Sequence, residues 1–262
     1  MSGRPAGAEA PGGRLVQASD RQAVQAEGRG AMDGEETGST PPARVGGHPR
    51  IEAVVLDLGN VVVRWDPYGP FDGVRDRREV AAAFEAIDFF ALNHRQDAGR
   101  SWAQARAEVA ARHPEHVWVI DRYLSHFPLA VPGPVPGTAE VVASLRAAGV
   151  RLLGLTNFSA ETYPHALPAA PAIELLEDVL VSGRVGLVKP DPAIFELLVE
   201  RYSLDRARTV MVDDTERNVA AARACGLHAI RFTDAPALVR DLRRLGLTPA
   251  EPPAAGAAVA PA

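Results

Sequence analysis

The chain has 262 residues, of which 47% are apolar and 23% are charged, and its formal net charge at pH 7 is −5. This composition suffices for a sizeable core, while the acidic balance and the lack of a dense Lys/Arg block argue against a nucleic-acid binder. No apolar stretch approaches the roughly eighteen residues of a membrane-spanning helix, so we expect no membrane partner. The single cysteine, Cys225, excludes an internal disulfide and is consistent with the reducing cytoplasm, where we expect the protein to lie.

Both ends of the chain have the composition of disordered tails. Residues 1–49 are rich in Gly, Ala, Pro and Ser without apolar periodicity, and residues 248–262 are rich in Pro and Ala. The first of these segments also lacks the apolar core of a secretory signal. We therefore expect the fold to begin near residue 50.

A short apolar run with β-branched residues precedes a turn at Gly59-Asn60. Residues 51–58 read Ile-Glu-Ala-Val-Val-Leu-Asp-Leu, which indicates a buried strand of a parallel sheet. Burial of an unpaired charge is unfavourable, so such a strand should not carry a carboxylate in its middle. Asp57 instead falls at the carboxyl end, where open α/β sheets bind their ligands. We interpret Asp57 as a reactive group presented from a rigid support.

Strand signals disappear between residues 67 and 133. Three segments there place apolar residues at helical spacing: 77–92, 101–112 and 114–127. Ser101 is suited to an N-cap, and Pro114 to a first helical turn. The insertion is therefore predicted to be all-helical.

After the insertion, strands alternate with helices. The predicted helices cover residues 138–148, 159–167, 192–202, 218–224 and 235–245. The predicted strands cover residues 150–155, 179–181, 209–212 and 228–232. This alternation is typical of an α/β fold with a doubly wound parallel sheet. The predicted core comprises residues 50–66 and 134–247, with the helical segment 67–133 inserted.

Polar residues follow several of the predicted strands. They are Asp57, Thr156-Asn157, Lys189 on a loop, and Asp213-Asp214. Because parallel strands end at one edge of a sheet, these side chains should converge. Lys189 is the only lysine in an arginine-rich chain, which suggests a site where a compact ammonium group cannot be replaced by a guanidinium.

This set of residues suits displacement at a negatively charged phosphorus atom. Asp57 is predicted to attack in line and to form an aspartyl-phosphate. Thr156 and Asn157 are predicted to bind phosphoryl oxygens. Lys189 is predicted to neutralise charge and to anchor the nucleophile.

A cation is needed where one anion attacks another. Mg²⁺ prefers hard oxygen ligands, and we expect it to be held by Asp57, Asp213 and the backbone carbonyl of Gly59. Asp214 and Asn218 are expected to support this acidic loop. Asp214 could alternatively be a helix N-terminal charge favoured by the dipole, and Asn218 could be an ordinary helical residue.

The same residues resemble the four motifs of the haloacid dehalogenase-like hydrolase superfamily, in the same order, over residues 51–245. The matching stretches are Asp57-Leu58-Gly59-Asn60-Val61, Leu155-Thr156-Asn157, Lys189-Pro190-Asp191 and Val212-Asp213-Asp214-Thr215-Glu216-Arg217-Asn218. The resemblance implies a Rossmann-like core, Mg²⁺ dependence and phosphatase activity on small phosphorylated metabolites. It also implies that residues 67–133 are a cap that closes over the substrate.

One position departs from this pattern. Most phosphatases of the superfamily carry a second Asp two residues after the nucleophile, as the acid that protonates the leaving group, and here that residue is Gly59. The Asp-Leu-Gly-Asn form resembles that of glucose-1-phosphate phosphatases, which suggests that the pattern is compatible with turnover. A sugar phosphate with a good leaving group is a possible substrate, because it depends less on the acid. Alternatively, Asp97, His94 or Asp66 supplies the proton through water.

Two other functions remain open from the sequence. A 2-haloacid dehalogenase uses the same Asp to attack carbon without a metal, and it also lacks the second Asp. A non-catalytic module could retain the pocket and bind a phosphorylated ligand. The sequence does not decide between a monomer and a homodimer.

Some other polar and aromatic residues lie outside the four motifs. Asn93, His94, Arg95, Asp97 and Arg100 are expected to form a solvated loop between cap helices, with contact to the substrate as the alternative. Trp65, Trp102 and Trp118 are expected to pack rather than to contact substrate.

Overall fold

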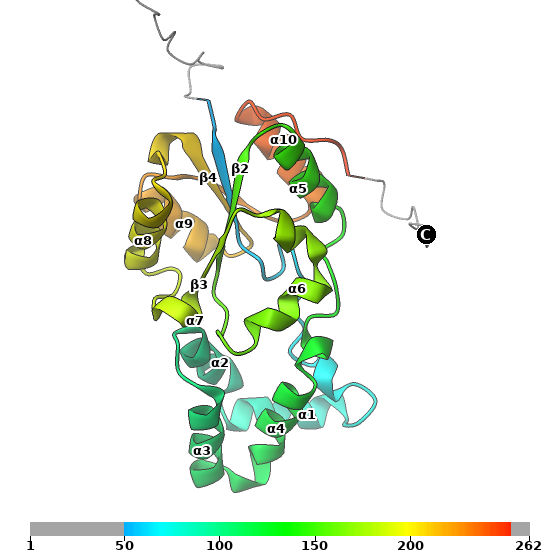
Figure 1. The fold of residues 1–262 in the computed structure, drawn as a ribbon. Helices are drawn as coiled ribbons and strands as arrows, with labels where there is room; N and C mark the ends of the chain where they lie inside the picture. Colours follow the sequence, from blue (N-terminus) through cyan, green and yellow to red (C-terminus); the bar gives the residue numbers. More distant parts are fainter. Residues whose placement is uncertain (1–49, 253–262) are drawn as a thin grey trace, which may run out of the picture. The chain divides into compact units, whose positions relative to one another are not determined.

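The computed structural model describes residues 50–252, and the predicted tail 1–49 lies outside the described residues. Five strands form one parallel sheet in the order β3-β2-β1-β4-β5 (Figure 1). Their bounds are Ala53–Leu56 (β1), Arg151–Thr156 (β2), Val179–Val181 (β3), Thr209–Asp213 (β4) and His228–Arg231 (β5). β1 lies in the middle, with Ala53 in register with Arg151 of β2 and with Thr209 of β4. The predicted α/β fold is confirmed.

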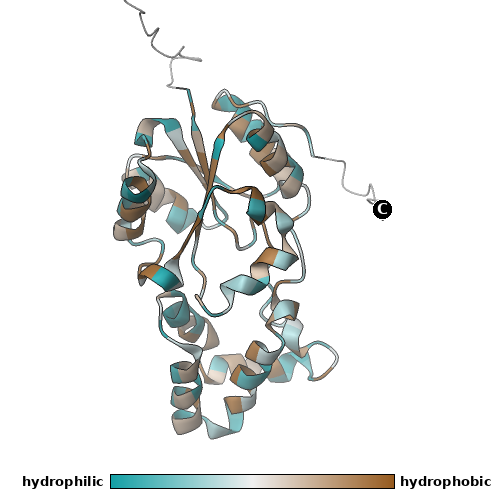
Figure 2. Ribbon diagram, viewed as in Figure 1, coloured by the Kyte–Doolittle hydropathy of each residue, from teal (hydrophilic) through white to brown (hydrophobic). Residues whose placement is uncertain are grey.

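Alternate side chains of β1 pack into different layers, as the period of a strand requires. Ala53 and Val55 belong to the apolar cluster that also holds residues of α8 (Pro192–Tyr202) and α9 (Glu216–Ala224). Val54 and Leu56 belong to the cluster that holds residues of α5 (Thr138–Ala147) and α10 (Ala235–Arg244). The sheet is therefore covered by helices on both faces, and its strands are largely apolar (Figures 1 and 2).

The segment between β1 and α5 is helical, as predicted. Its α-helices are α1 (Arg77–Ala86), α2 (Phe89–Asp97), α3 (Trp102–Arg112) and α4 (Val117–Ser125). Short 3₁₀ segments precede α1 (Gly69–Phe71), join α3 to α4 (Pro114–His116) and follow α4 (Phe127–Ala130). The predicted helix 77–92 is two helices, because Asp88 has a left-handed backbone with φ of 48°. Ser101 caps α3 as predicted, and its hydroxyl accepts a hydrogen bond from the Gln104 N–H.

The remaining differences are at element ends and in one loop. The predicted helix 159–167 is a turn followed by the 3₁₀ segment Tyr163–His165 and the short α6 (Ala166–Ala169), because Pro164 and Pro168 limit regular helical hydrogen bonding. A short helix that the sequence did not indicate, α7 (Ser182–Val185), follows β3, and the short 3₁₀ segments Pro171–Leu175 and Arg206–Arg208 precede β3 and β4.

Two further observations bear on the sequence predictions. The predicted tail 248–262 is described only to residue 252, and in that part the Ala250 N–H donates to Ser144 Oγ at 3.0 Å. Within residues 50–252, no helix combines the length and the apolar character needed to cross a bilayer.

Candidate active site

Asp57 is held directly after β1 at the carboxyl edge of the sheet. Its N–H donates to the Val212 carbonyl at 2.8 Å, which continues the pairing of β1 with β4. Its Oδ1 accepts a hydrogen bond from the Leu58 N–H at 2.7 Å, and its Oδ2 lies 2.9 Å from Nζ of Lys189. The carboxylate orientation is therefore fixed at both oxygens.

Lys189 connects two carboxylates in the interior of the site. Its Nζ lies 2.9 Å from Asp57 and 2.6 Å from Oδ2 of Asp213, and the residue is 1% exposed. Its backbone is fixed by Asn157 after β2: the Lys189 N–H donates to Oδ1 at 2.8 Å, and Nδ2 donates to the Lys189 carbonyl at 2.9 Å. Asn157 thus positions the loop that carries the only lysine.

Burial and charge set the protonation of this group. Burial raises the pKa of Asp57 to about 7, because it outweighs the lowering by Lys189, and the nearby Asp213 and Asp214 raise it further. Burial alone would lower the pKa of Lys189, but the two carboxylates Asp57 and Asp213 raise it above its ordinary value. The lysine therefore stays charged, and the surplus of negative charge favours a second cation nearby.

Three carboxylates could share such a cation. Asp57, Asp213 and Asp214 each offer an oxygen, and these oxygens lie within 4.8 Å of one another. Asp213 is fully buried, and its carboxylate accepts hydrogen bonds from Lys189, the Thr215 N–H and the Asn218 amide. Asp214 lines the adjoining cavity. The carboxylate oxygens of Asp57, Asp213 and Asp214 are hard ligands, which suits Mg²⁺.

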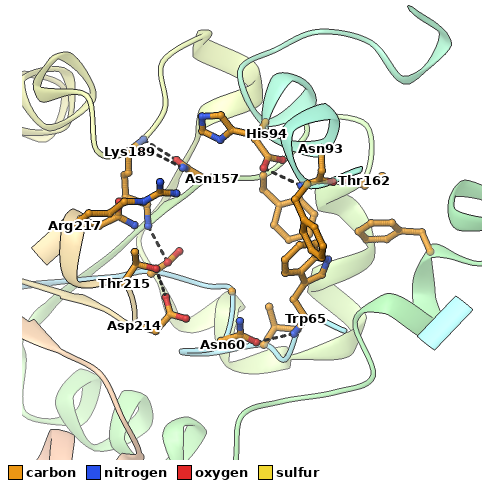
Figure 3. Close-up of a pocket in the computed structure, with 18 of the residues that line it drawn as sticks. Asn60, Trp65, Asn93, His94, Asn157, Thr162, Lys189, Asp214, Thr215 and Arg217 are labelled. Atoms are coloured by element: carbon orange, nitrogen blue, oxygen red, sulfur yellow. Dashed lines mark hydrogen bonds and ion pairs between the residues drawn. The ribbon is translucent and has the colours of Figure 1, made fainter. Parts of the chain in front are cut away.

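A cavity of about 310 Å³ adjoins the carboxyl edge of the sheet and is closed on another side by cap residues (Figure 3). Its residues are Asp57, Gly59, Asn60, Val63, Trp65, Phe90, Asn93, His94, Asp97, Tyr123, Phe127, Asn157, Phe158, Thr162, Lys189, Asp214, Thr215, Arg217 and Asn218. In Figure 3, Trp65, Asn93 and Thr162 lie on the side away from Lys189 and Asp214. The cavity therefore spans from the predicted nucleophile to the cap.

Most of the residues predicted from the motifs meet in this cavity. Asp57, Gly59, Asn157, Lys189, Asp214 and Asn218 all line it. Thr156, the last residue of β2, is 1% exposed, and Asp213 is fully buried, so neither is among the lining residues. Arg217, which the sequence did not single out, adds a second cationic side chain to the lining.

The prediction that residues near position 95 form a solvated loop was wrong for three of the five residues. Asn93, His94 and Asp97 lie on α2 and line the cavity, and the Asn93 amide donates to Asp97 Oδ2 at 3.1 Å. Burial raises the pKa of Asp97 to about 7, and a backbone hydrogen bond from Ser159 lowers it only in part. Arg95 and Arg100 instead form ion pairs with Glu108. The helical spacing of residues 93, 94 and 97 was the sequence signal that could have placed these three side chains on one face of a helix.

Aromatic residues line the cap side of the cavity. They are Trp65, Phe90, Tyr123, Phe127 and Phe158, which we call the aromatic wall. Trp65 packs against the core, as expected, and also lines the cavity, whereas Trp102 is buried and Trp118 packs against the core. Motif spacing could not find this wall, because its members are scattered over ninety-odd residues of sequence.

Comparisons with known proteins agree with this architecture. Residues 19–226 match the family model described as haloacid dehalogenase-like hydrolase. A phosphoglycolate phosphatase of Rhodospirillum rubrum is 29% identical over 196 residues, which are 67% of this chain and 71% of that protein. The drimenol cyclase drtB of Aspergillus calidoustus is 25% identical over 204 residues, 77% of this chain and 38% of that protein.

One further comparison extends this picture. The sesquiterpene phosphatase astK of Aspergillus oryzae is 29% identical over 106 residues, 40% of this chain and 54% of that protein. The chain thus spans only about two fifths to a little over half of the length of these two fungal relatives.

Solved structures share the fold. A HAD family enzyme from Bacteroides thetaiotaomicron, in complex with magnesium and inorganic phosphate, matches with a TM-score of 0.56 and 18% identity, over 70% of this chain and 95% of that one. The L-2-haloacid dehalogenase of Xanthobacter autotrophicus, with chloropropionic acid covalently bound, matches with a TM-score of 0.50 and 18% identity, over 74% and 83%.

Proposed function

Because the chain belongs to the haloacid dehalogenase-like hydrolase family, we propose that it hydrolyses phosphate monoesters with Asp57 as nucleophile. The observation that carries this proposal is the pairing of Asp57 with Lys189 at 2.9 Å, beside further carboxylates and facing a cavity. A charged lysine and an acidic cluster that can hold a cation are what attack on an anionic phosphoryl group requires.

The proposed reaction proceeds in two displacements. An oxygen of Asp57 attacks the phosphorus in line, the ester oxygen leaves with its electron pair, and an aspartyl-phosphate remains. Water then attacks the phosphorus and returns the Asp57 carboxylate. Lys189 neutralises charge throughout, and Asn157 acts mainly by holding the Lys189 loop. Thr156 is 1% exposed and does not line the cavity, so of the two predicted phosphate contacts only Asn157 faces it.

Magnesium fits the donor set of this site. We assign the carboxylates of Asp57, Asp213 and Asp214, whose oxygens lie within 4.8 Å of one another, and the Gly59 carbonyl as its protein ligands. Asp213 also accepts hydrogen bonds from Lys189 and Asn218, and so anchors the lysine. When bound, the ion would stabilise the charge that develops on the phosphoryl oxygens. The magnesium bound by the Bacteroides enzyme supports the choice of ion.

Asp97 is the proposed proton donor in place of the missing Asp at Gly59. Of the three groups considered, Asp97 and His94 line the cavity, whereas Asp66 is outside it and accepts a hydrogen bond from the Tyr68 N–H. The raised pKa of Asp97, about 7, keeps a large fraction of this carboxyl protonated near neutral pH. Asp97 lies at the end of α2, on the cap side, and lines the same cavity as Asp57.

We propose that the substrate is a small phosphate monoester. The related proteins include phosphoglycolate phosphatases and a sesquiterpene phosphatase, so they point to phosphate esters of quite different alcohols. From the sequence alone, the resemblance of Asp57-Leu58-Gly59-Asn60 to glucose-1-phosphate phosphatases suggested a sugar phosphate. The aromatic residues in the cavity lining argue against that choice.

Hydrolysis of p-nitrophenyl phosphate tests the proposed function. This substrate has a good leaving group and should not depend on an acid. We expect turnover with Mg²⁺, and loss of turnover with EDTA or in Asp57→Asn. Halide release from 2-chloropropionate in EDTA would instead support the dehalogenase. Binding of inorganic phosphate without turnover of any ester would support the non-catalytic module.

A further inference from the structure

We infer that the alcohol portion of the substrate is apolar, an alkyl, isoprenoid or aryl group, rather than a sugar or another polyol. This inference rests on the proposed phosphate-ester function and names its substrate class. It is carried by the aromatic wall, which lines the same cavity as Asp57.

The aromatic wall is continuous from one residue to the next. Ring centroids of Phe90 and Trp65 are 6.3 Å apart, those of Tyr123 and Phe127 are 5.3 Å apart, and those of Phe127 and Phe158 are 6.0 Å apart. Trp65 and Tyr123 are joined by a hydrogen bond of 3.1 Å from the indole Nε1 to the phenol oxygen. Edge-to-face contacts of this kind fix the rings and preform an apolar surface.

The polar atoms of this wall are largely committed to each other. The indole N–H of Trp65 is used by Tyr123, and burial raises the pKa of the Tyr123 phenol, so it remains protonated. Outside the wall, Asn93, His94, Asp97 and Thr162 also line the cavity, and the Asn93 amide donates to Asp97. Sugar hydroxyls placed against the rings of the wall itself would lose hydrogen bonds to water without a replacement there, which is unfavourable.

Phe90 marks where the apolar group enters. It lines the cavity and yet is 51% exposed, whereas Tyr123 and Phe127 are buried. An apolar ligand would cover this ring and remove it from water. The cavity volume of about 310 Å³ is at the lower end for ligand pockets, which span roughly 300–1,000 Å³, so longer chains should extend past Phe90.

Binding of n-alkylphosphonates to the Mg²⁺-loaded protein tests this inference without requiring turnover. By calorimetry, Kd should fall about two- to fourfold per methylene from ethyl- to octylphosphonate. The 3,4-dihydroxy analogue of butylphosphonate should bind about tenfold more weakly than butylphosphonate itself. Excess inorganic phosphate should displace every member, since the phosphonate group occupies the Asp57 site.

Matched variants assign the effect to the wall. Phe90→Ala should weaken octylphosphonate binding about fivefold and ethylphosphonate binding much less, because the ring contacts only the longer chain. Leu129→Ala is the control: Leu129 is 50% exposed but does not line the cavity, so the chain-length dependence should be unchanged.

The outcomes separate this inference from the proposed function. Three results would overturn the apolar-substrate inference, even in an active phosphatase: a Kd that does not change with alkyl chain length, tighter binding of the dihydroxy analogue, or binding that inorganic phosphate does not displace. Turnover of p-nitrophenyl phosphate on the same preparation reports on the hydrolase alone. A protein that shows the chain-length dependence without turnover would keep the apolar site and refute the hydrolase.

Discussion

Asp97 is the single residue whose protonation links the cap to the proposed chemistry. Burial raises its pKa to about 7, so its proton is lost as the pH rises above that value. Asp97→Asn should lower kcat/KM for an alkyl phosphate about 100-fold and remove the fall of the wild-type rate above about pH 7. Hydrolysis of p-nitrophenyl phosphate should change only a few-fold. An unchanged pH profile for the alkyl phosphate would refute the role of Asp97.

The same raised pKa affects stability. A carboxyl that binds its proton more tightly in the folded state stabilises the fold below the unfolded-state value of about 3.8, and this stabilisation is lost as the pH rises through about 7. The free energy of unfolding of Asp97→Asn should therefore decline less than that of wild type across this pH range.

Gly59 offers a complementary test of the missing acid. A Cβ built at Gly59 meets no atom within 4 Å among the described residues, so a side chain can be added there without a clash. Gly59→Asp, combined with Asp97→Asn, should raise kcat/KM for alkyl phosphates at least tenfold above that of Asp97→Asn alone, because it places a carboxyl two residues after Asp57. Gly59→Asn is the matched control and should give no such increase. Equal rescue by both would show that proton donation is not involved.

At the scale of elements, α7 supports the loop that follows β2. The hydroxyl of Ser182 accepts a hydrogen bond from the Phe158 N–H at 2.9 Å and donates to the Asp97 carbonyl at 2.6 Å. It therefore joins the β2 loop to the end of α2. This short helix fixes parts of the core and of the cap that both line the cavity.

Gly183 allows this close approach. An added Cβ would lie 2.5 Å from the Ala160 nitrogen and 2.7 Å from the Phe158 oxygen, both of which are backbone atoms. Gly183→Ala should lower the free energy of unfolding by about 1–3 kcal/mol, measured by urea denaturation, and should weaken phosphate binding because the loop must move. A change below about 0.5 kcal/mol would show that the loop adapts freely.

The strands and several helices of the core were predictable because neighbouring residues in the sequence determine them. The apolar, β-branched run that ends at Asp57 indicates a strand, and the proline at the start of α8 indicates a helix start. The break at Asp88 was not predictable, because apolar periodicity continues across it and only the backbone of that residue leaves the helical region. The turn before α6 was also mistaken for helix, although its prolines were a usable signal.

At the scale of the whole molecule, convergence of the four polar clusters followed from the sheet alone. Parallel strands bring their carboxyl ends to one edge, so Asp57, Asn157, Lys189 and Asp214 could be placed together from sequence. The aromatic wall could not, because it depends on how the cap packs near the loop that carries Phe158. The division of roles between Asp213 and Asp214 likewise depends on burial, which the sequence does not specify.

Metal binding should also be visible in the stability of the whole protein. Mg²⁺ at about 100 times its Kd should add about 2.7 kcal/mol, which raises the Tm of a domain of this size by about 5–10 °C. Asp214→Asn should lose most of this increment, because its carboxylate faces the cavity. The same rise in both proteins would contradict the assignment of Asp214 as a ligand, and thermal melting with and without EDTA measures it.

The phosphoryl group on Asp57 tests the proposed mechanism most directly. The Mg²⁺-loaded protein is mixed with p-nitrophenyl phosphate, acid-quenched within the first turnover, and digested for mass analysis of the peptide that holds Asp57. One phosphoryl group is expected on that peptide, absent from Asp57→Asn and lost after the substrate is consumed. Turnover retained by Asp57→Asn, or a phosphoryl group on any other residue, would contradict nucleophilic catalysis by Asp57.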